Sequence, residues 1–286
     1  MLDLTLDQGD GRVVWLSSTA PAVIKEMKRP PILIRPGQFT ASVRDITLQD
    51  GLGHLRVQSM AHHARSCYLG YTEDGFHYFA KGIGWCLSPG WHPDRGNTGV
   101  LAGWAARRER DIALGLSLEH IRVAEPVAIY SYDWLPGLAS SSRWPSAEVR
   151  DLDGSAAEPS LYIYRSRERF RMADLPVAAR ELIPTVRDRF PAILSSLRDS
   201  VTKLHSLGGH DYSLSLHNVW ADGSRVDFEY VVLGDKPHPV EQLNQNLASW
   251  QAKEWAALRC LAFEIADMVS LEADVSYVES LCSPAS

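Results

Sequence analysis

The chain has 286 residues, 45% of them hydrophobic, which is enough to bury a substantial core in one bilobal unit or two small domains. Its 29 Lys and Arg against 35 Asp and Glu give a net charge of -6, which excludes the broad basic field that attracts nucleic acids or anionic membranes. No apolar stretch is long enough to cross a bilayer, and the four cysteines lack metal-ligand spacing, so we expect reduced thiols in a cytoplasmic protein.

The first half of the sequence is typical of strands with one helix. Two aromatic-rich runs joined by Glu73-Asp74-Gly75 predict a β-hairpin. A polar loop then leads into a helix expected at 99–118, because Ala, Arg and Leu are abundant there and the apolar residues have helical spacing. The expected strands are 13–16, 32–34, 66–72, 76–81, 123–132 and 161–164, the last two separated by a surface loop.

The second half is predominantly helical. Residues 175–207 predict two helical segments, broken near Pro184 and Pro191 because proline lacks a backbone N–H. A hairpin turning at Asp222-Gly223 is expected next, and 241–269 carries a long helical pattern.

Between the helices, residues 204–218 resemble the protein-kinase catalytic-loop pattern L-H-x-x-G-x-x-H-x-D-L-x-x-x-N. Ser213 stands where that pattern has its catalytic Asp, and Asp227-Phe228-Glu229 follows nine positions after Asn218. The residues that match without a gap are Leu204, His205, Gly208, Leu214 and Asn218. With the order of elements, this resemblance predicts an α+β, protein-kinase-like bilobal fold. Its strand-rich N-terminal lobe would be 1–165, and its helical C-terminal lobe 166–286.

Phosphoryl and nucleotidyl transfer need a cation on the phosphates, a carboxylate that fixes this cation, and oxygen ligands for Mg²⁺. Lys81, at the end of the hairpin, is the expected phosphate ligand, and Glu109 on the following helix is its expected ion-pair partner. Asn218 and Asp227 are the expected metal ligands. The sequence therefore predicts ATP and Mg²⁺ as cofactors. The competing interpretation is that Lys81 is a solvated strand-edge residue and that Asn218 and Asp227 cap turns.

A further resemblance concerns the stretch Phe79-Ala-Lys81-Gly-Ile-Gly84 and the later pair Arg108-Glu109. They are similar to the L-K-G-A-G and R-E stretches of the selenoprotein O family of kinase-fold protein adenylyltransferases. The nine-residue step from Asn218 to Asp227 also matches that family.

This resemblance implies how a nucleotide would be bound. The backbone N–H groups of Gly82 and Gly84 would approach its phosphates. Arg165 and Arg171 would hold the terminal phosphates, so that the nucleotide lies reversed relative to a kinase. The enzyme would then transfer AMP to an acceptor and release pyrophosphate.

The base is the weakest part of the pattern. His217 replaces the Asp that precedes the metal-binding Asn in that family, and it could act as a base because histidine titrates near neutrality. Equally, His217 could only donate a hydrogen bond within the loop. Asp211 is the nearest carboxylate to Ser213, so it is the second candidate.

Three functions remain open on the sequence. The chain could transfer AMP to a hydroxyl of a protein or peptide acceptor, or transfer phosphate to a small molecule or peptide in a biosynthetic pathway. It could also be a pseudokinase that binds a nucleotide or a partner without catalysis. The absent catalytic Asp favours the first and third. The acceptor and the oligomeric state are left open.

Overall fold

The computed structural model describes residues 11–29, 66–81, 101–132, 159–228, 230–237, 241–271 and 275–282. The chain divides into two compact units. The first consists of residues 1–110 and 125–167, and the second of residues 111–124 and 168–286.

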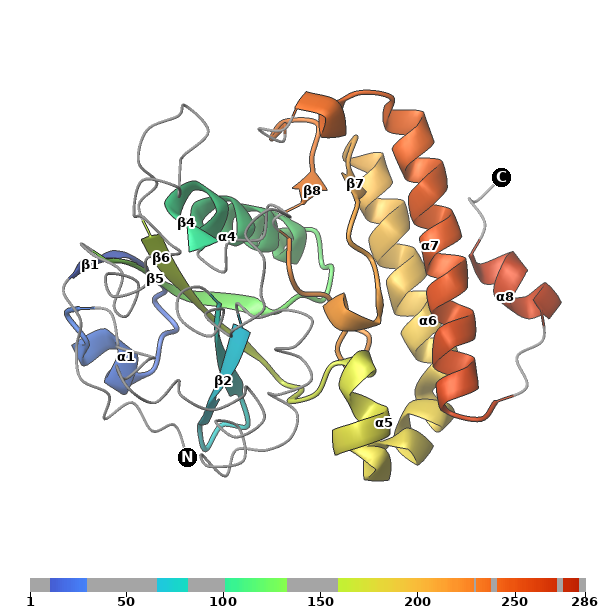
Figure 1. The fold of residues 1–286 in the computed structure, drawn as a ribbon, viewed down its shortest axis with the longest axis horizontal. Helices are drawn as coiled ribbons and strands as arrows, with labels where there is room; N and C mark the ends of the chain where they lie inside the picture. The colour runs from blue at the N-terminus through green and yellow to red at the C-terminus, as the bar shows by residue number, and fades with distance from the viewer. Residues whose placement is uncertain are drawn as a thin grey trace, which may run out of the picture. The chain divides into compact units, whose positions relative to one another are not determined.

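The first unit is built on an antiparallel sheet in the order β1-β5-β6-β3-β2, with β4 also pairing with β6 (Figure 1). Its central strand, β6, is buried along most of its length, and its Tyr162 and Tyr164 rings stack, the latter also on Phe79 of β3. The strands are β1 (Gly11–Leu16), β2 (Ser66–Tyr71), β3 (His77–Lys81), β4 (Leu101–Ala102), β5 (Glu125–Tyr132) and β6 (Pro159–Ser166). The short helix α1 (Ala22–Glu26) also belongs to this unit.

The predicted hairpin is confirmed as β2 and β3, which pair from Ser66 with Lys81 to Tyr71 with His77. Its turn closes through a hydrogen bond from the Thr72 N–H to the Phe76 carbonyl, 3.0 Å long. Gly75 adopts φ +80°, a conformation that favours glycine, which explains the turn signal in the sequence. The expected strand at 32–34 lies outside the described residues.

The expected helix before β5 is α4 (Gly103–Leu118), which begins later than predicted because Leu101 and Ala102 pair with β6 as strand β4. The boundary between the two units falls within α4, after Arg110. Its buried residues recur at helical spacing along one face. They are Ala105, Ala106, Glu109, Ile112, Ala113 and Leu116.

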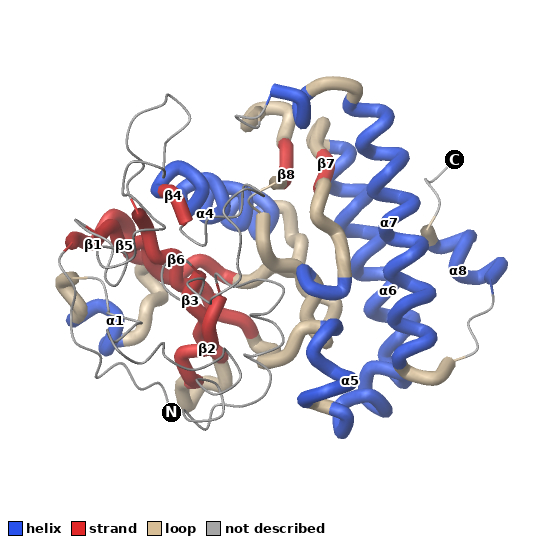
Figure 2. Tube along the Cα trace, viewed as in Figure 1, coloured by secondary structure: helices blue, strands red, loops and turns tan. Residues whose placement is uncertain are grey.

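The second unit is helical, and its core lies between α6 and α7, which run side by side (Figure 2). Phe190, Ile193 and Leu197 of α6 are buried there with Leu258 and Ile265 of α7. The helices are α5 (Leu175–Ala178), α6 (Ile183–Ser206), α7 (Leu247–Met268) and α8 (Val275–Leu281), with 3₁₀ turns at Met172–Asp174, Arg180–Leu182, Leu216–Asn218 and Glu241–Asn244.

Two predicted helix boundaries are wrong. Pro191 lies inside α6 and does not end it, because the buried residues on both sides, Phe190 and Ile193 among them, hold the helix against the core. The predicted break near Pro184 is present, because Pro184 occupies the first turn of α6, where proline is tolerated. The last long helix begins at Leu247 and not at residue 241, since Asn246 adopts the left-handed φ of 55° and separates it from the preceding 3₁₀ turn.

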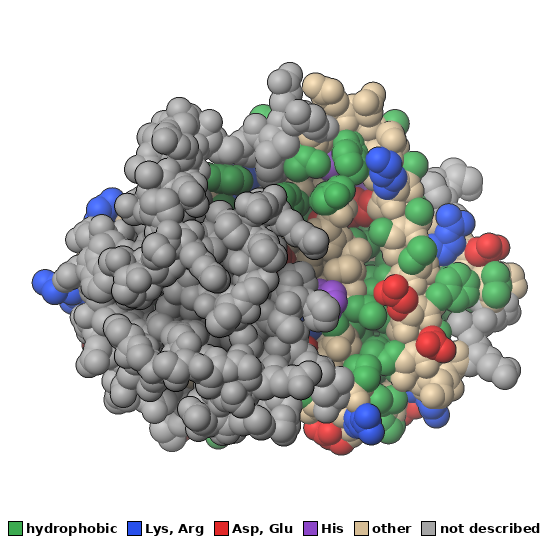
Figure 3. All heavy atoms as spheres, viewed as in Figure 1, with side chains coloured by type: hydrophobic (Ala, Val, Ile, Leu, Met, Phe, Trp, Pro, Cys, Tyr) green, Lys and Arg blue, Asp and Glu red, His purple; other side chains and the backbone are tan. Residues whose placement is uncertain are grey.

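The expected α+β organisation, with a strand-rich first part and a helical second part, is confirmed, and its likeness to the protein-kinase fold stays a prediction. On the face drawn in Figure 3, acidic and basic side chains of the helical unit are interspersed among apolar ones. Among the described residues, none of the helices has the length and apolar character that a membrane span requires.

Candidate functional site

Lys81 and Glu109 form the ion pair that the sequence predicted. Lys81 is the last residue of β3, Glu109 lies in the first half of α4, and the distance from Lys81 Nζ to Glu109 Oε2 is 2.7 Å. Both side chains are almost fully buried, 3% and 1% exposed. The interpretation of Lys81 as a solvated strand-edge residue is therefore wrong.

Burial of this pair is informative because removing two charges from water costs several kcal/mol per ion, which their attraction often fails to recover. An apolar pair of similar volume would stabilise the unit at least as well. The burial of this ion pair is therefore not explained by a gain in stability. The pair places a cation in a fixed position at the end of β3. Gly82 and Gly84, the expected phosphate-binding glycines, lie outside the described residues.

In the second unit, the catalytic-loop motif begins in the last turn of α6 and continues into the short strand β7 (His210–Asp211), which pairs with β8 (Val231–Val232). Gly209 precedes β7 at a point where a Cβ atom would collide with the carbonyl oxygen of Val232 and the side chain of Leu204. Glycine is therefore required at this position, between the end of helix α6 and strand β7. The segment then runs through the 3₁₀ turn Leu216–Asn218 into the hairpin.

Asn218 is held at both ends. Its Nδ2 donates to the backbone carbonyl of Ser213 at 2.8 Å, and its own carbonyl accepts from the Val226 N–H at 3.0 Å. The first bond fixes the orientation of the amide, so Oδ1 is the atom left over. This oxygen is buried and has no hydrogen-bond partner among the described residues. A buried acceptor without a hydrogen-bond partner is available to a water molecule or a metal ion.

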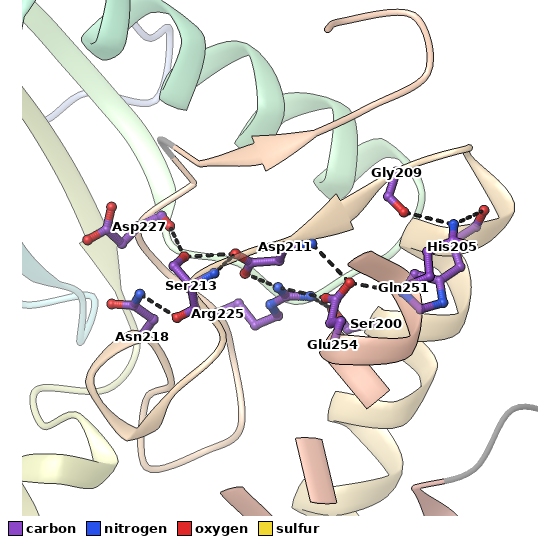
Figure 4. A network of polar contacts seen from close by, with 10 residues as sticks. All are labelled: Ser200, His205, Gly209, Asp211, Ser213, Asn218, Arg225, Asp227, Gln251 and Glu254. Atoms are coloured by element: carbon purple, nitrogen blue, oxygen red, sulfur yellow. Dashed lines mark hydrogen bonds and ion pairs between the residues drawn. The ribbon is translucent and has the colours of Figure 1, made fainter. Parts of the chain in front are cut away.

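Asp227 follows the hairpin and adopts φ 68°, the left-handed region that is uncommon for a residue with a side chain. The expected hairpin is confirmed: the Trp220 N–H donates to the Ser224 carbonyl at 2.8 Å, and Gly223 takes φ +84° at the turn. Figure 4 shows the Asp227 carboxylate and the Asn218 amide pointing to the same side of the loop, away from Asp211.

This donor set fits Mg²⁺. One carboxylate and one amide oxygen are hard ligands of the type Mg²⁺ prefers, and Asn218 Oδ1 is the orphaned acceptor that such an ion would satisfy. Within the described ranges, no cluster of three or more His, Cys, Asp or Glu side chains offers a metal site. Mg²⁺ does not need one, because it commonly takes its remaining ligands from waters and substrate phosphates.

The candidate base Asp211 is enclosed. It is 4% exposed, and its Oδ1 accepts from the backbone N–H of Ser213 at 2.6 Å and from the Ser213 hydroxyl at 2.7 Å. Its Oδ2 accepts from Arg225 Nη2. Both carboxylate oxygens are therefore occupied by groups of the protein, and an acceptor hydroxyl does not reach them in this arrangement.

The candidate base His217 lies on the 3₁₀ turn and is partly buried. Its carbonyl accepts from Arg171 Nη1 at 2.8 Å, so one of the two predicted phosphate-binding arginines contacts the loop directly. The Arg171 guanidinium also lies over the Trp220 ring, 5.5 Å from its centroid.

Arg165 belongs to the first unit, unlike Arg171, and each has partners within its own unit. Arg165 Nε and Nη2 donate to Glu125 Oε2 at 2.9 and 2.6 Å, and its guanidinium lies 3.9 Å from the centroid of the Phe76 ring. The two arginines thus make internal contacts, and their predicted action as one phosphate clamp stays a prediction.

The sequence analysis missed a buried polar network around Arg225 and Glu254 (Figure 4). Arg225 Nη1 donates to Ser200 Oγ at 2.8 Å, and Nη2 contacts both Asp211 and, at 3.6 Å, Glu254 Oε1. Glu254 Oε2 in turn accepts from the Asp211 N–H at 2.9 Å and lies 2.9 Å from His205 Nε2. A signal in the sequence existed for Glu254 alone, which occupies the helix face of buried Leu258 and Leu261.

Comparison with known proteins finds one distant structural likeness. No model of a known protein family matches the sequence, and no curated protein matches it. Among solved structures, the rhoptry antigen kinase domain from Toxoplasma gondii is similar, with a TM-score of 0.41 and 13% sequence identity over 76% of this chain and 70% of that chain.

Proposed function

We propose that this chain is a kinase-fold transferase that binds Mg-ATP and moves part of it to a hydroxyl group. The observation that carries the proposal is the buried Lys81–Glu109 ion pair, 2.7 Å long. Glu109 fixes a lysine whose burial is costly, and a fixed ammonium is what the phosphates of a nucleotide require. In this proposal Lys81 binds phosphate oxygens.

Asn218 and Asp227 are proposed to hold Mg²⁺. The support is the orphaned Oδ1 of Asn218 and the common direction of the two side chains in Figure 4. Ser213 contributes by accepting the Asn218 amide N–H, which leaves Oδ1 as the only ligand atom of that side chain. When bound, Mg²⁺ neutralises charge on the phosphates and on the departing group.

For the transferred group we propose AMP, on the basis of the resemblance to the selenoprotein O family. The acceptor oxygen would form a bond to the α-phosphorus, the bond from this phosphorus to the bridging oxygen would break, and pyrophosphate would leave. The hydroxyl proton would go to His217, because the alternative base, Asp211, is enclosed by Ser213 and Arg225. The acceptor would be a Ser, Thr or Tyr hydroxyl of a protein or peptide.

The test is transfer of label from ATP carrying it at the α- or the γ-phosphate, with casein or the chain itself as acceptor. AMP transfer places only the α label on the protein, and Lys81→Met and Asp227→Asn should each abolish it. The γ label on the acceptor would overturn AMP transfer in favour of the phosphotransferase. Label that persists in the folded Asp227→Asn variant would overturn the assigned metal ligand.

A second function, nucleotide binding without catalysis, is favoured by one specific observation. Ser213 replaces the catalytic Asp, and Asp211 is turned into the protein by its bonds to Ser213 and Arg225. A pseudokinase of this kind would bind ATP with Mg²⁺ in equilibrium dialysis but would transfer neither label. AMP or phosphate transfer by the purified chain would exclude it.

A further inference from the structure

Two turns of the second unit have the same local design. In Asp211-Tyr212-Ser213 the carboxylate accepts from the N–H and the hydroxyl of the serine two residues later, at 2.6 and 2.7 Å. In Asp222-Gly223-Ser224 the corresponding bonds are 2.8 and 2.6 Å. A carboxylate capping a backbone N–H two residues ahead is a common turn device, so this pattern alone assigns no function to either aspartate.

The cations opposite the two carboxylates differ. Asp211 and Arg225 are both about 2% exposed in their side chains and in direct contact. Asp222 faces Arg122 at 3.7 Å, and the Arg122 side chain is 48% exposed. A surface pair of this kind contributes little, whereas a buried pair fixes the positions of both partners, since neither charge can be left alone in the interior.

The buried pair joins the two segments that carry the proposed metal ligands. On one side, Asp211 holds Ser213, and the Ser213 carbonyl holds the Asn218 amide. On the other side, Arg225 lies two residues before Asp227 in the hairpin strand, and the intervening Val226 N–H bonds the Asn218 carbonyl. The Ser213 hydroxyl also lies 3.5 Å from the Asp227 carbonyl.

We infer that Asp211 is a positioning residue for the Mg²⁺ site and acts through Arg225 and Ser213, and that it is not the base of the reaction. The inference rests on the proposed function, because it requires Asn218 and Asp227 to hold the metal. The ion pair sets the register between the loop and the hairpin, and this register places the two oxygen ligands side by side. Supports of this kind typically change metal affinity about 10- to 100-fold when they are lost.

The experiment measures the affinity of the protein for ATP once in the presence of Mg²⁺ and once in the presence of EDTA. The ratio of the two affinities measures how far ATP binding depends on the metal. We compare Asp211→Asn with its matched control Asp222→Asn, since each removes one charge and keeps an oxygen that can cap the serine. We expect Asp211→Asn to reduce the ratio about 10-fold or more and Asp222→Asn to leave it unchanged. Because Asp211→Asn removes the carboxylate that contacts Arg225 directly and could prevent folding, the double variant Asp211→Asn/Arg225→Gln is measured as well, and it should show the same loss.

Asp227→Ala separates failure of the inference from failure of the proposed function. If the wild-type ratio is one, or if Asp227→Ala leaves it intact, the metal assignment fails and the inference falls with it. If Asp227→Ala removes the metal dependence while Asp211→Asn or the double variant retains it, only the positioning role is overturned. A loss of turnover in Asp211→Asn with an unchanged ratio would likewise overturn it, since that result is expected of a base.

Discussion

Among the described residues, the buried ion pairs Lys81–Glu109 and Arg225–Asp211 differ in the segments that they join. Lys81–Glu109 joins one strand to one helix within the first unit. Arg225–Asp211 is the centre of a network in the second unit that also includes Ser200 of α6 and Glu254 of α7. The first pair fixes one cation at the end of a strand, whereas the second connects segments that are far apart in the sequence.

This difference indicates a difference in role. A buried network of hydrogen bonds and ion pairs that joins several segments favours one arrangement of those segments. A buried ion pair that does not join several segments could be replaced by apolar residues without loss of stability. We therefore expect the Arg225 network to matter first for folding and the Lys81 pair to matter first for nucleotide binding, and the following variants test this comparison.

The largest effect is expected for Arg225→Met. It removes the cation that lies between Asp211 and Glu254, so two carboxylates remain buried without it. Breaking a buried pair in this way costs about 3 to 5 kcal/mol. Urea unfolding followed by circular dichroism should show a loss of this size. A loss below about 1 kcal/mol would mean that the network does not hold the second unit together.

A smaller loss of stability is expected at the Lys81–Glu109 pair, where the effects on folding and on nucleotide binding can be separated. Lys81→Met leaves Glu109 buried without its ammonium partner and should lower the free energy of unfolding by about 3 kcal/mol. Adding Glu109→Gln removes the stranded charge, so the double variant should recover most of this stability. Mg-ATP binding should be lost in both. Recovery of binding together with stability would contradict a direct role for Lys81.

The Lys81–Glu109 pair could be predicted from the sequence because each partner is marked by its own element. Lys81 ends a hairpin strand with a clear turn signal, and Glu109 lies on the next helix. The Arg225 network could not be found in this way. Its members come from α6, β7, the hairpin and α7, and no local pattern shows that Ser200, Asp211 and Glu254 meet at one guanidinium.

The same reason explains what local patterns do not show. Asp211 is a candidate base because it is the carboxylate closest in sequence to Ser213, but its contact with Arg225 in the interior has no local signal. Pro191 was a predicted helix break because local propensity disfavours proline, whereas the apolar residues beside it are held by contacts with α7. In both cases a contact between distant segments decided the outcome.

A matched pair of serines on α6 sharpens the comparison further. Ser200 accepts from Arg225 in the interior at 2.8 Å, and Ser196 accepts from Arg122 near the surface at 3.3 Å. Ser200→Ala should cost about 1.5 to 3 kcal/mol because a buried hydrogen bond to a charged group is lost. Ser196→Ala should change stability by less than about 0.5 kcal/mol, since water replaces the serine. Equal losses would show that the two arginines are equivalent.

The smallest effect concerns Asp174, a buried carboxylate that accepts from the Arg171 N–H at 3.1 Å and has a raised pKa. Burial raises the pKa of Asp174, while the Arg171 charge and this hydrogen bond oppose the rise. The folded state therefore holds the proton more tightly than the unfolded state. The contribution of Asp174 to stability is fully present below the unfolded pKa, about 3.9, and is lost as pH rises through the folded pKa.

Asp174→Asn keeps an oxygen for the Arg171 N–H and removes the charge. The variant should consequently be at least as stable as the parent at pH 7, and its advantage should shrink as pH falls toward 4, where the parent carboxylate becomes protonated. Urea unfolding of both proteins at several pH values between 4 and 7 measures this difference. A stability advantage that is constant across this pH range would show that burial does not raise the pKa of Asp174. An advantage that grows on acidification would mean that the Arg171 charge outweighs burial in setting the pKa of Asp174.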